Sequence, residues 1–226
     1  MKKLSVFINA ILAGFCIGLG GTIFLKLKDA FPGGNVVGAL LFTVGLFLVC
    51  TRGYSLYTGK VCYIFDNKPS YLLDILIIWI GNLLGCMLIS GLENLTTLSG
   101  ATAGINVTAA TMVAGKMNSS LLSLFILGAF CNIFIFIAVN GFVKNPHELG
   151  KYLALFLGVS IFILCGTEHS VADMYYMTVS KTLYAQPAQS FLRLFVITLG
   201  NLVGGVFLPL MERLREKLAA EKKLAA

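Results

Sequence analysis

Long apolar stretches alternate with short polar connections along most of the chain. Each stretch has at least the ~20 residues that a helix needs to cross the hydrocarbon layer of a bilayer. The pattern predicts six membrane-spanning segments, at residues 5–25, 36–65, 71–91, 120–143, 152–180 and 190–211. Residues 93–119 are rich in Thr, Ala and Gly, and we expect only weak helical character there. The predicted fold class is therefore an all-α membrane protein.

Polar residues interrupt the second and the fifth predicted span. The first interruption lies at 51–55 and the second at 165–173, which holds Glu168, His169 and Asp173. Ionisable groups at membrane depth are costly unless they face water, a partner or a substrate. A broken helix is tolerated there only where its backbone lines a cavity or is buried in protein. The pattern predicts a polar site within the membrane at 165–173.

The composition supports a multi-span membrane protein. Of the 226 residues, 58% are hydrophobic and 12% are charged, whereas about 25% of the residues of a soluble domain are charged. The net charge of +7 does not indicate a nucleic-acid partner, because the cations are not gathered into a patch with interleaved aromatic residues. The expected surroundings are a lipid bilayer.

The distribution of lysine and arginine predicts the orientation. The chain ends and alternate turns are expected on one side of the membrane. Their basic residues are Lys2, Lys3, Lys68, Lys144, Lys151, Arg213, Arg215, Lys217, Lys222 and Lys223. The other side has Lys26, Lys28, Lys116 and Lys181. Cytoplasmic loops are enriched in these residues, so we expect both termini in the cytoplasm. Residues 1–13 could begin a signal peptide, but the apolar run continues to Leu25 and predicts a retained span. Residues 223–226 look like an expression-vector linker.

The two halves of the chain resemble each other. AGFC at 13–16 matches GAFC at 128–131, and IGNLLG at 80–85 matches LGNLVG at 199–204. Cys50 and Cys165, which follow matching apolar residues, keep the same offset as Cys16 and Cys131. Each half holds three spans, so the second half must be inverted in the membrane. We expect a single channel domain over 1–226, with inverted repeats at about 5–92 and 120–211 and a cytoplasmic tail at 212–226. Such repeats are typical of transporters, with the site at their interface.

The cysteines and histidines do not indicate a metal centre, a disulfide or a cofactor. Six cysteines lie in or beside apolar runs without a CxxC pair, which is typical of buried small hydrophobic residues. The only histidine besides His169 is His147, in a predicted turn, so there is no pair to ligate haem. We therefore expect a protein that is not an enzyme.

Several motifs resemble the formate/nitrite transporter family of bacterial anion channels. The sequence CGTEHSVADMY at 165–175 is similar to the Gly-aromatic-Glu-His-Ser-Val/Ile-Ala-Asn-Met signature of that family. SLYTG at 55–59 is similar to its Leu-Phe-Thr loop, and GAFCN at 128–132 and LGN at 199–201 also fit. The resemblance extends from Lys3 to about Leu210. It implies an aquaporin-like fold of six helices, a homopentamer with one pore in each protomer, and a bacterial inner membrane.

The resemblance also implies roles for individual residues. His169 is similar to the central pore histidine, Thr58 to the loop threonine that approaches it, and Lys116 to the lysine near the fourth helix. Asn132 and Asn201 are similar to pore-side asparagines. Phe42, Leu46 and Phe162 are similar to the cytoplasmic constriction, and Leu56, Tyr57 and Ile135 to the outer one.

Four positions depart from the family pattern. Thr167 replaces an aromatic residue, Asp173 replaces Asn, Tyr57 replaces the common Phe, and Arg52 is unexpected in the first break. These changes affect the preferred substrate more than the fold. From the residues themselves we predict that Arg52 in the first break contacts Glu168 in the facing break, and that Asp173 caps the helix after it, since Asp is favoured at that position.

The leading functional hypothesis is a channel or proton-coupled transporter for small monovalent weak-acid anions, with formate or nitrite first and hydrosulfide next. An ion in a low-dielectric constriction is costly, so the anion would be attracted by Lys116, would gain a proton or a hydrogen bond at His169, and would cross as the neutral acid. The alternative is an aquaporin-type pore for water or small neutral solutes. Against it, the paired Asn-Pro-Ala motif is absent from the sequence.

Overall fold

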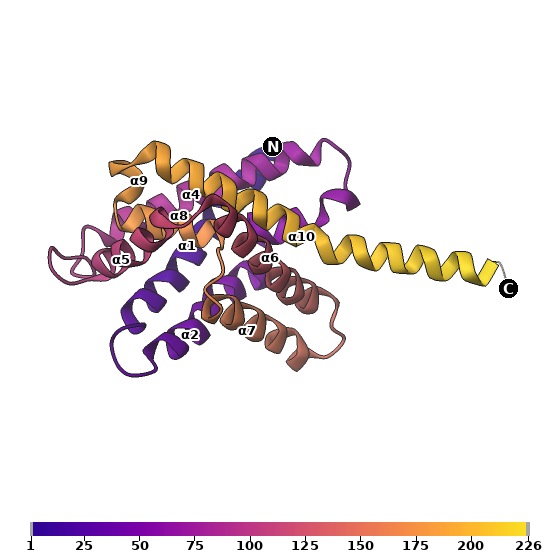
Figure 1. Cartoon of the computed structure of the whole chain (residues 1–226), viewed down its shortest axis with the longest axis horizontal. Coiled ribbons are helices and arrows are strands. Elements are labelled where there is room, and N and C mark those ends of the chain that lie inside the picture. Colours follow the sequence, from indigo (N-terminus) through magenta and orange to yellow (C-terminus); the bar gives the residue numbers. More distant parts are fainter. Residues whose placement is uncertain (1, 225–226) are drawn as a thin grey trace.

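The computed structural model describes residues 2–224 as a bundle of helices (Figure 1). In chain order the helices are α1 (Lys2–Leu27), α2 (Gly34–Arg52), α3 (Tyr57–Lys60), the 3-10 helix η1 (Val61–Asp66), α4 (Tyr71–Glu93), α5 (Ile105–Asn118), α6 (Leu121–Lys144), α7 (Glu148–Leu164), α8 (Ser170–Val179), α9 (Thr182–Ala185) and α10 (Pro187–Leu224). The protein is all-α, as the sequence predicts.

Five of these helices, α1, α2, α4, α6 and α10, are long and apolar enough to cross a membrane. The fifth predicted span is split into α7, with 17 residues, and α8, with 10 residues. A sixth crossing made by α7 and α8 together stays a prediction. The interruptions themselves fall where the sequence places them, between α2 and α3 and between α7 and α8.

The structure differs from one expectation. The second half of the segment 93–119, where the abundance of Thr, Ala and Gly suggested only weak helical character, forms the 14-residue helix α5. The helix that contains the last predicted span continues through the polar tail to Leu224, with Pro209 inside it, and the end of the span at residue 211 stays a prediction. The tail is an exposed extension of α10, drawn in yellow in Figure 1. The last two residues of the predicted linker, 225 and 226, lie outside the described residues.

Matching helix pairs pack through matching glycines in the two halves of the chain. In the first half α1 packs on α4, where a Cβ at Gly85 would lie 2.1 Å from the backbone oxygen of Ile11. In the second half α6 packs on α10, where a Cβ at Gly204 would lie 1.8 Å from the backbone oxygen of Ala129. Both glycines belong to the repeated GNL-containing motif, which therefore brings two backbones into direct contact in each half.

Each helix break begins at a glycine with a positive φ. Gly53 (φ 69°) ends α2, and Gly166 (φ 63°) follows α7. A residue with a side chain is strained in this left-handed conformation. The two glycines therefore fix where the second and fifth spans are interrupted.

Both described chain ends lie at the same face of the bundle, which we call the terminal face. Lys3 in α1 pairs with Asp74 at the start of α4, and Arg213 in α10 pairs with Asp66 at the end of η1. The η1–α4 segment therefore contacts both α1 and α10, the first and the last helix, through these two ion pairs. The opposite face is formed by α5, α9 and the loops next to them, at the far side of Figure 1 from the end of α10.

The glycine contacts give a stability prediction. Gly204→Ala places a methyl group against the backbone of α6, and we expect the free energy of unfolding to fall by about 1–3 kcal/mol. Gly91→Ala is the matched control, because a Cβ there meets no atom within 4 Å. Thermal unfolding of both variants in detergent is the measurement. Equal melting temperatures would contradict the close α6–α10 contact.

Candidate functional site

His169 lies at the second break, where it caps α8. Its Nδ1 accepts a hydrogen bond from the backbone N–H of Ala172 (3.1 Å), and its Nε2 lies 3.0 Å from Oγ1 of Thr58. Because Nδ1 is an acceptor, the neutral ring has its hydrogen on Nε2 and donates it to Thr58. The side chain is 3% exposed. The structure thus brings together the histidine and threonine that the sequence predicted to approach each other.

The predicted helix cap is wrong in one respect. Asp173 lies within the first turn of α8, and His169 takes the capping position instead. The imidazole suits this place because its ring nitrogen can accept the free backbone N–H three residues ahead. Asp173 is left to interact with another element.

Two aromatic rings lie in series on one side of His169. The Phe162 ring stacks on the imidazole with centroids 5.4 Å apart, and Phe42 meets Phe162 edge to face at 6.2 Å. Phe42 is 1% exposed and Phe162 is 3% exposed. Two aromatic rings and one imidazole are therefore in series, which is the arrangement of a closed apolar constriction.

Two asparagines hold the breaks in place. Asn82 in α4 accepts from the N–H of Tyr57 (2.8 Å) and donates to the carbonyl oxygens of Ser55 (2.9 Å) and Ala10 (2.8 Å). Asn201 in α10 does the same at the second break. It accepts from the N–H of Ser170 (2.9 Å) and donates to the carbonyl oxygens of Glu168 (2.9 Å) and Gly128 (2.8 Å).

The two amides replace hydrogen bonds that the broken helices lose, so both asparagines are scaffold residues in this structure. Asn201 was predicted to line the pathway, and its amide is fully engaged with backbone. Asn82 was missed, although the repeated GNL motif gave a signal for it, since its partner in the repeat was already a candidate.

Asn132 in α6 joins the two breaks. Its Nδ2 donates to the carbonyl oxygens of Thr58 (3.1 Å) and Asn201 (2.7 Å), while its buried Oδ1 has no protein partner among the described residues. The predicted pathway residue therefore positions Thr58 and leaves one acceptor free.

Lys116 of α5 reaches the second break and pairs with two carboxylates. Its Nζ contacts Oε2 of Glu168 and lies 2.9 Å from Oδ1 of Asp173. The side chains of these three residues are 14%, 7% and 1% exposed, respectively. Lys116 is therefore not a free cation. Its positive charge, which was expected to attract an anion, is balanced by the neighbouring carboxyl groups of Glu168 and Asp173.

The predicted contact between Arg52 and Glu168 is wrong. Glu168 takes Lys116 as its cation, and Arg52 is exposed at the end of α2, with no acidic side chain within 4 Å among residues 2–224. The reason is that Lys116 comes from α5, a helix that the sequence analysis did not expect.

A small cavity lies on the side of His169 that faces Lys116. It has a volume of about 90 Å³, and its lining includes Phe162, Thr167, His169, Lys116 and Asp173. At about 30 Å³ for each water in the liquid, a space of this size holds roughly three waters or one small acid.

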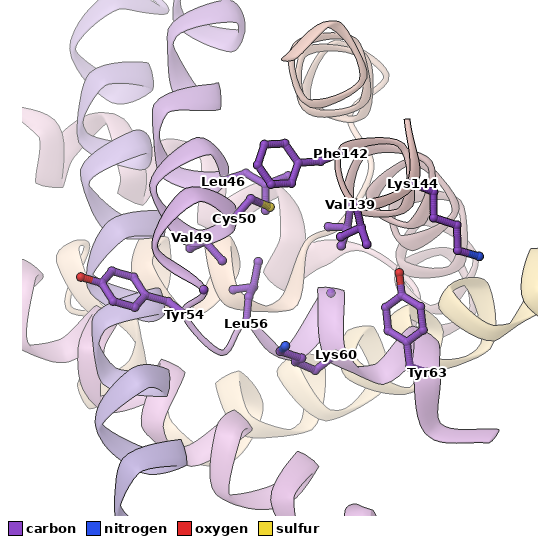
Figure 2. A pocket seen from close by; sticks show the side chains of 13 residues that line it. Leu46, Val49, Cys50, Tyr54, Leu56, Lys60, Tyr63, Val139, Phe142 and Lys144 are labelled. Carbon is purple, nitrogen blue, oxygen red and sulfur yellow. The ribbon is translucent and has the colours of Figure 1, made fainter. Parts of the chain in front are cut away.

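A larger cavity of about 340 Å³ opens near the terminal face (Figure 2). Leu46 and Leu56 belong to its lining, with Lys60 and Tyr63 from the segment after the first break and Lys144 from the end of α6. The lining residues that the structure describes include two lysines and no carboxylate. This basic cavity was not predicted, because the two lysines are 84 positions apart in the printed numbering and only the fold brings them together.

Phe42 and Leu56, which were predicted to belong to opposite constrictions, lie at different depths in the bundle. Ser55 N–H bonds to the carbonyl oxygen of Asn9 in α1, whereas Phe42 packs beside Gly20 of the same helix. At ~1.5 Å per residue, Phe42 is roughly 16 Å farther from the terminal face than the first break. If the termini are cytoplasmic, Phe42 and Phe162 form the outer constriction and Leu56 lies on the cytoplasmic side.

The remaining constriction residues have distinct positions. Leu46 lines the same cavity as Leu56 and so belongs with the residues of the terminal side. Tyr57 is 3% exposed and donates its hydroxyl hydrogen to the carbonyl oxygen of Thr198 in α10 (3.1 Å), and Ile135 is 1% exposed in α6. Neither Tyr57 nor Ile135 is among the residues that line the cavities described above.

Comparison with known proteins decides the family. The family model described as "Formate/nitrite transporter" matches residues 1–213. The chain belongs to the formate/nitrite transporter family. It is therefore a transport protein with several membrane-spanning helices, as the sequence motifs implied.

Similar proteins include bacterial and archaeal members of the family. The chain is 26% identical to the formate channel FocB of Escherichia coli, over 92% of this chain and 85% of that protein. It is 29% identical to a probable formate transporter of Methanothermobacter thermautotrophicus, over 88% and 84% of the two chains. It is 26% identical to the nitrite transporter NirC of Salmonella typhimurium, over 91% and 80%.

Two solved structures share the fold. A pentameric formate channel with formate bound superposes with a TM-score of 0.81 at 24% identity, over 95% of this chain and 98% of that one. An FNT family ion channel gives a TM-score of 0.81 at 25% identity, over 90% and 86%.

The asparagine contacts give a prediction about stability. Asn201→Ala and Asn82→Ala each remove three hydrogen bonds to buried backbone groups, two of which lie at a helix break, and we expect each to lower the free energy of unfolding by at least about 2 kcal/mol. Asn67→Ala, at an exposed residue with one hydrogen bond to the Tyr63 carbonyl, is the control and should change little. Thermal unfolding in detergent is the measurement. If Asn201→Ala kept full stability while transport fell, the scaffold role would be refuted.

Proposed function

We propose that this protein is a channel for small monovalent weak acids, with formate or nitrite as the first candidates and hydrosulfide as the next. The observation on which the proposal rests is the Nε2–Thr58 contact of His169. Phe162 stacks on the imidazole, and Leu56 and Gly59, the chain neighbours of this contact, line the basic cavity. Family membership and the printed names of the similar proteins support the substrate class.

The path runs between the two cavities. From the opposite face it begins at the small cavity, where Phe162 packs between Phe42 and His169, and continues past Leu56 and Leu46 into the larger cavity at the terminal face. A hydrated ion would lose its water at the apolar rings, so the neutral acid is the form that crosses at lowest cost.

His169 binds the substrate through its Nε2 hydrogen. An acid or its anion that replaces Thr58 Oγ1 as the acceptor keeps this hydrogen bond throughout. A second proton on Nδ1 would displace the cap bond to Ala172 N–H, so the imidazole stays neutral. Of the two roles considered for His169, hydrogen bonding is the one that fits the geometry, and the proton has another source.

Lys60 and Lys144 gather anions at the terminal face. They line the larger cavity without an acidic neighbour in its lining, whereas Lys116 is paired with Glu168 and Asp173. A cavity whose lining carries charges of one sign raises the local concentration of oppositely charged substrate. We propose that anion attraction is strongest at this face.

The remaining features of the proposal follow from the family and the fold. The chain forms a homopentamer in a bacterial inner membrane, with its termini in the cytoplasm and one path in each protomer. The name of the solved pentameric formate channel and the many exposed leucines on α4 and α7 support an assembly in which protomers and lipid cover these helices.

The first prediction tests His169. We expect His169→Asn to keep the cap of α8, because Asn is a good N-cap, and to lose the Nε2 donor. Flux of formate, nitrite and hydrosulfide into proteoliposomes should fall at least about tenfold, as expected for loss of a charge-assisted hydrogen bond. Lactate and water flux in the same vesicles complete the panel.

The outcomes separate the hypotheses. Flux of acids in the unaltered protein that decreases in His169→Asn supports the proposed channel. Water flux without acid flux would replace it with the aquaporin-type alternative. Undiminished acid flux in a folded His169→Asn variant would remove His169 from the path.

The second prediction tests the basic cavity. Replacing Lys60 and Lys144 by Gln should raise the KM for anion uptake from the terminal face about tenfold at low salt, and the difference should shrink as ionic strength rises. Lys68→Gln is the control, because Lys68 is exposed near the same face and lies outside the cavity lining. An equal effect of Lys68→Gln would show that surface charge in general, and not the cavity, attracts the anion.

A further inference from the structure

Asp173 has one carboxylate oxygen bound and one free. Oδ1 lies 2.9 Å from Nζ of Lys116, while Oδ2 is buried and has no hydrogen-bond partner among the described residues. The side chain is 1% exposed, and Asp173 belongs to the lining of the small cavity beside His169. A buried carboxylate oxygen without a partner is costly, so its presence beside the cavity needs a physical explanation.

The charge balance around Lys116 favours a proton on Oδ2 of Asp173. Two carboxyl groups, Glu168 and Asp173, share a single ammonium group in a buried place. With both carboxylates ionised the cluster would bear one net negative charge, which is unfavourable at low dielectric. One proton on the carboxyl pair makes the cluster neutral. Oδ2 of Asp173 is the carboxyl oxygen of this pair that is buried without a hydrogen-bond partner among the described residues, so it is the place for this proton.

The other charged or titratable groups around Asp173 do not change this balance. Lys116, His169 and Tyr176 line the same cavity, and Glu168 pairs with Lys116. The helices α1, α4 and α10, which pack against α8, carry Cys16, Glu93 and Arg193, and α6 carries Cys131. Glu93 is held by the hydroxyl groups of Thr22 and Tyr175. Arg193 binds the carbonyl oxygens of Lys116 and Met117 at the end of α5 and lines a separate cavity.

We infer that Asp173 is the proton donor for the transported anion on the opposite-face side of His169. The inference rests on the proposed function and names the proton source that it lacks. The anion A⁻ enters the small cavity and accepts a hydrogen bond from Oδ2–H. The O–H bond of Asp173 breaks as the proton moves to A⁻, which leaves Asp173 ionised and HA neutral. HA moves past Phe162 to the Nε2 hydrogen of His169, which lines the same cavity, and a hydronium ion from the solution at that face restores the proton on Asp173.

This step explains the departure from the family pattern at this position. An asparagine has the shape of a protonated aspartate and keeps the cluster with Lys116 and Glu168 neutral, but it cannot release a proton to a substrate. An aspartate supplies the same neutral shape together with a proton that can be transferred. Each anion therefore crosses with one proton taken from the solution at the opposite face.

The test compares Asp173→Asn with Asp29→Asn, an exposed acidic residue at the opposite face. Proteoliposomes that contain the whole protein take up formate at a series of external pH values. We expect Asp173→Asn to fold normally, to transport as the unaltered protein does at acid pH, where HA is present in solution, and to be at least about tenfold slower at neutral pH. Asp29→Asn should follow the unaltered protein throughout.

A second measurement does not depend on transport. The infrared spectrum of the unaltered protein should show the carbonyl stretch of a protonated, buried carboxylic acid, and Asp173→Asn should lose that band while Asp29→Asn keeps it. The band present and lost, with the altered pH profile, supports the inference. A protein whose flux and infrared spectrum are the same in Asp173→Asn overturns it and leaves the channel intact. Absence of formate flux in the unaltered protein would overturn the proposed function, and the infrared band would then report on Asp173 separately.

Discussion

The structure depends on how it satisfies the backbone of two broken helices inside an apolar bundle. Gly53 and Gly166 end the first halves of these helices, and each break frees N–H and carbonyl groups that the helix would have paired. Asn82 and Asn201 supply amides that take over these bonds from neighbouring helices. In hydrocarbon each unpaired group costs several kcal/mol. Without the asparagines neither His169 nor Thr58 would have a fixed place.

The need to pair the backbone at the second break also determines how His169 can form hydrogen bonds. Because Nδ1 of the imidazole accepts the N–H of Ala172, only Nε2 can bind another group, and Nε2 acts as a hydrogen-bond donor. The break thus fixes the tautomer as well as the position of the ring. A neutral hydrogen-bond donor between two cavities favours a substrate that can accept a hydrogen bond both as the anion and as the acid. Formate, nitrite and hydrosulfide share this property, because they are conjugate bases of weak acids.

Much of the fold followed from the sequence, because long apolar runs and glycine-marked interruptions are local signals. Helix bounds confirm five of the predicted spans as long apolar helices and both breaks. One hydrogen bond joins Thr58 to His169, which the family resemblance had implied. The partner of Glu168 was not predicted, because Lys116 is on α5, whose small residues give a weak helical pattern. The basic cavity and the side of each constriction depend on which helices pack together, and no local pattern encodes that.

In the proposed channel, the two ends of the path differ in charge for a physical reason. At the terminal face Lys60 and Lys144 are open to solvent, where water screens them, so they can attract an anion without binding it tightly. At the opposite side the cation is buried, where an unbalanced charge would hold an anion too firmly to release it. Pairing Lys116 with two carboxyl groups removes that trap and leaves a neutral, protic cavity next to the rings. The charge that collects the substrate and the groups that let it pass are thus kept apart along the path.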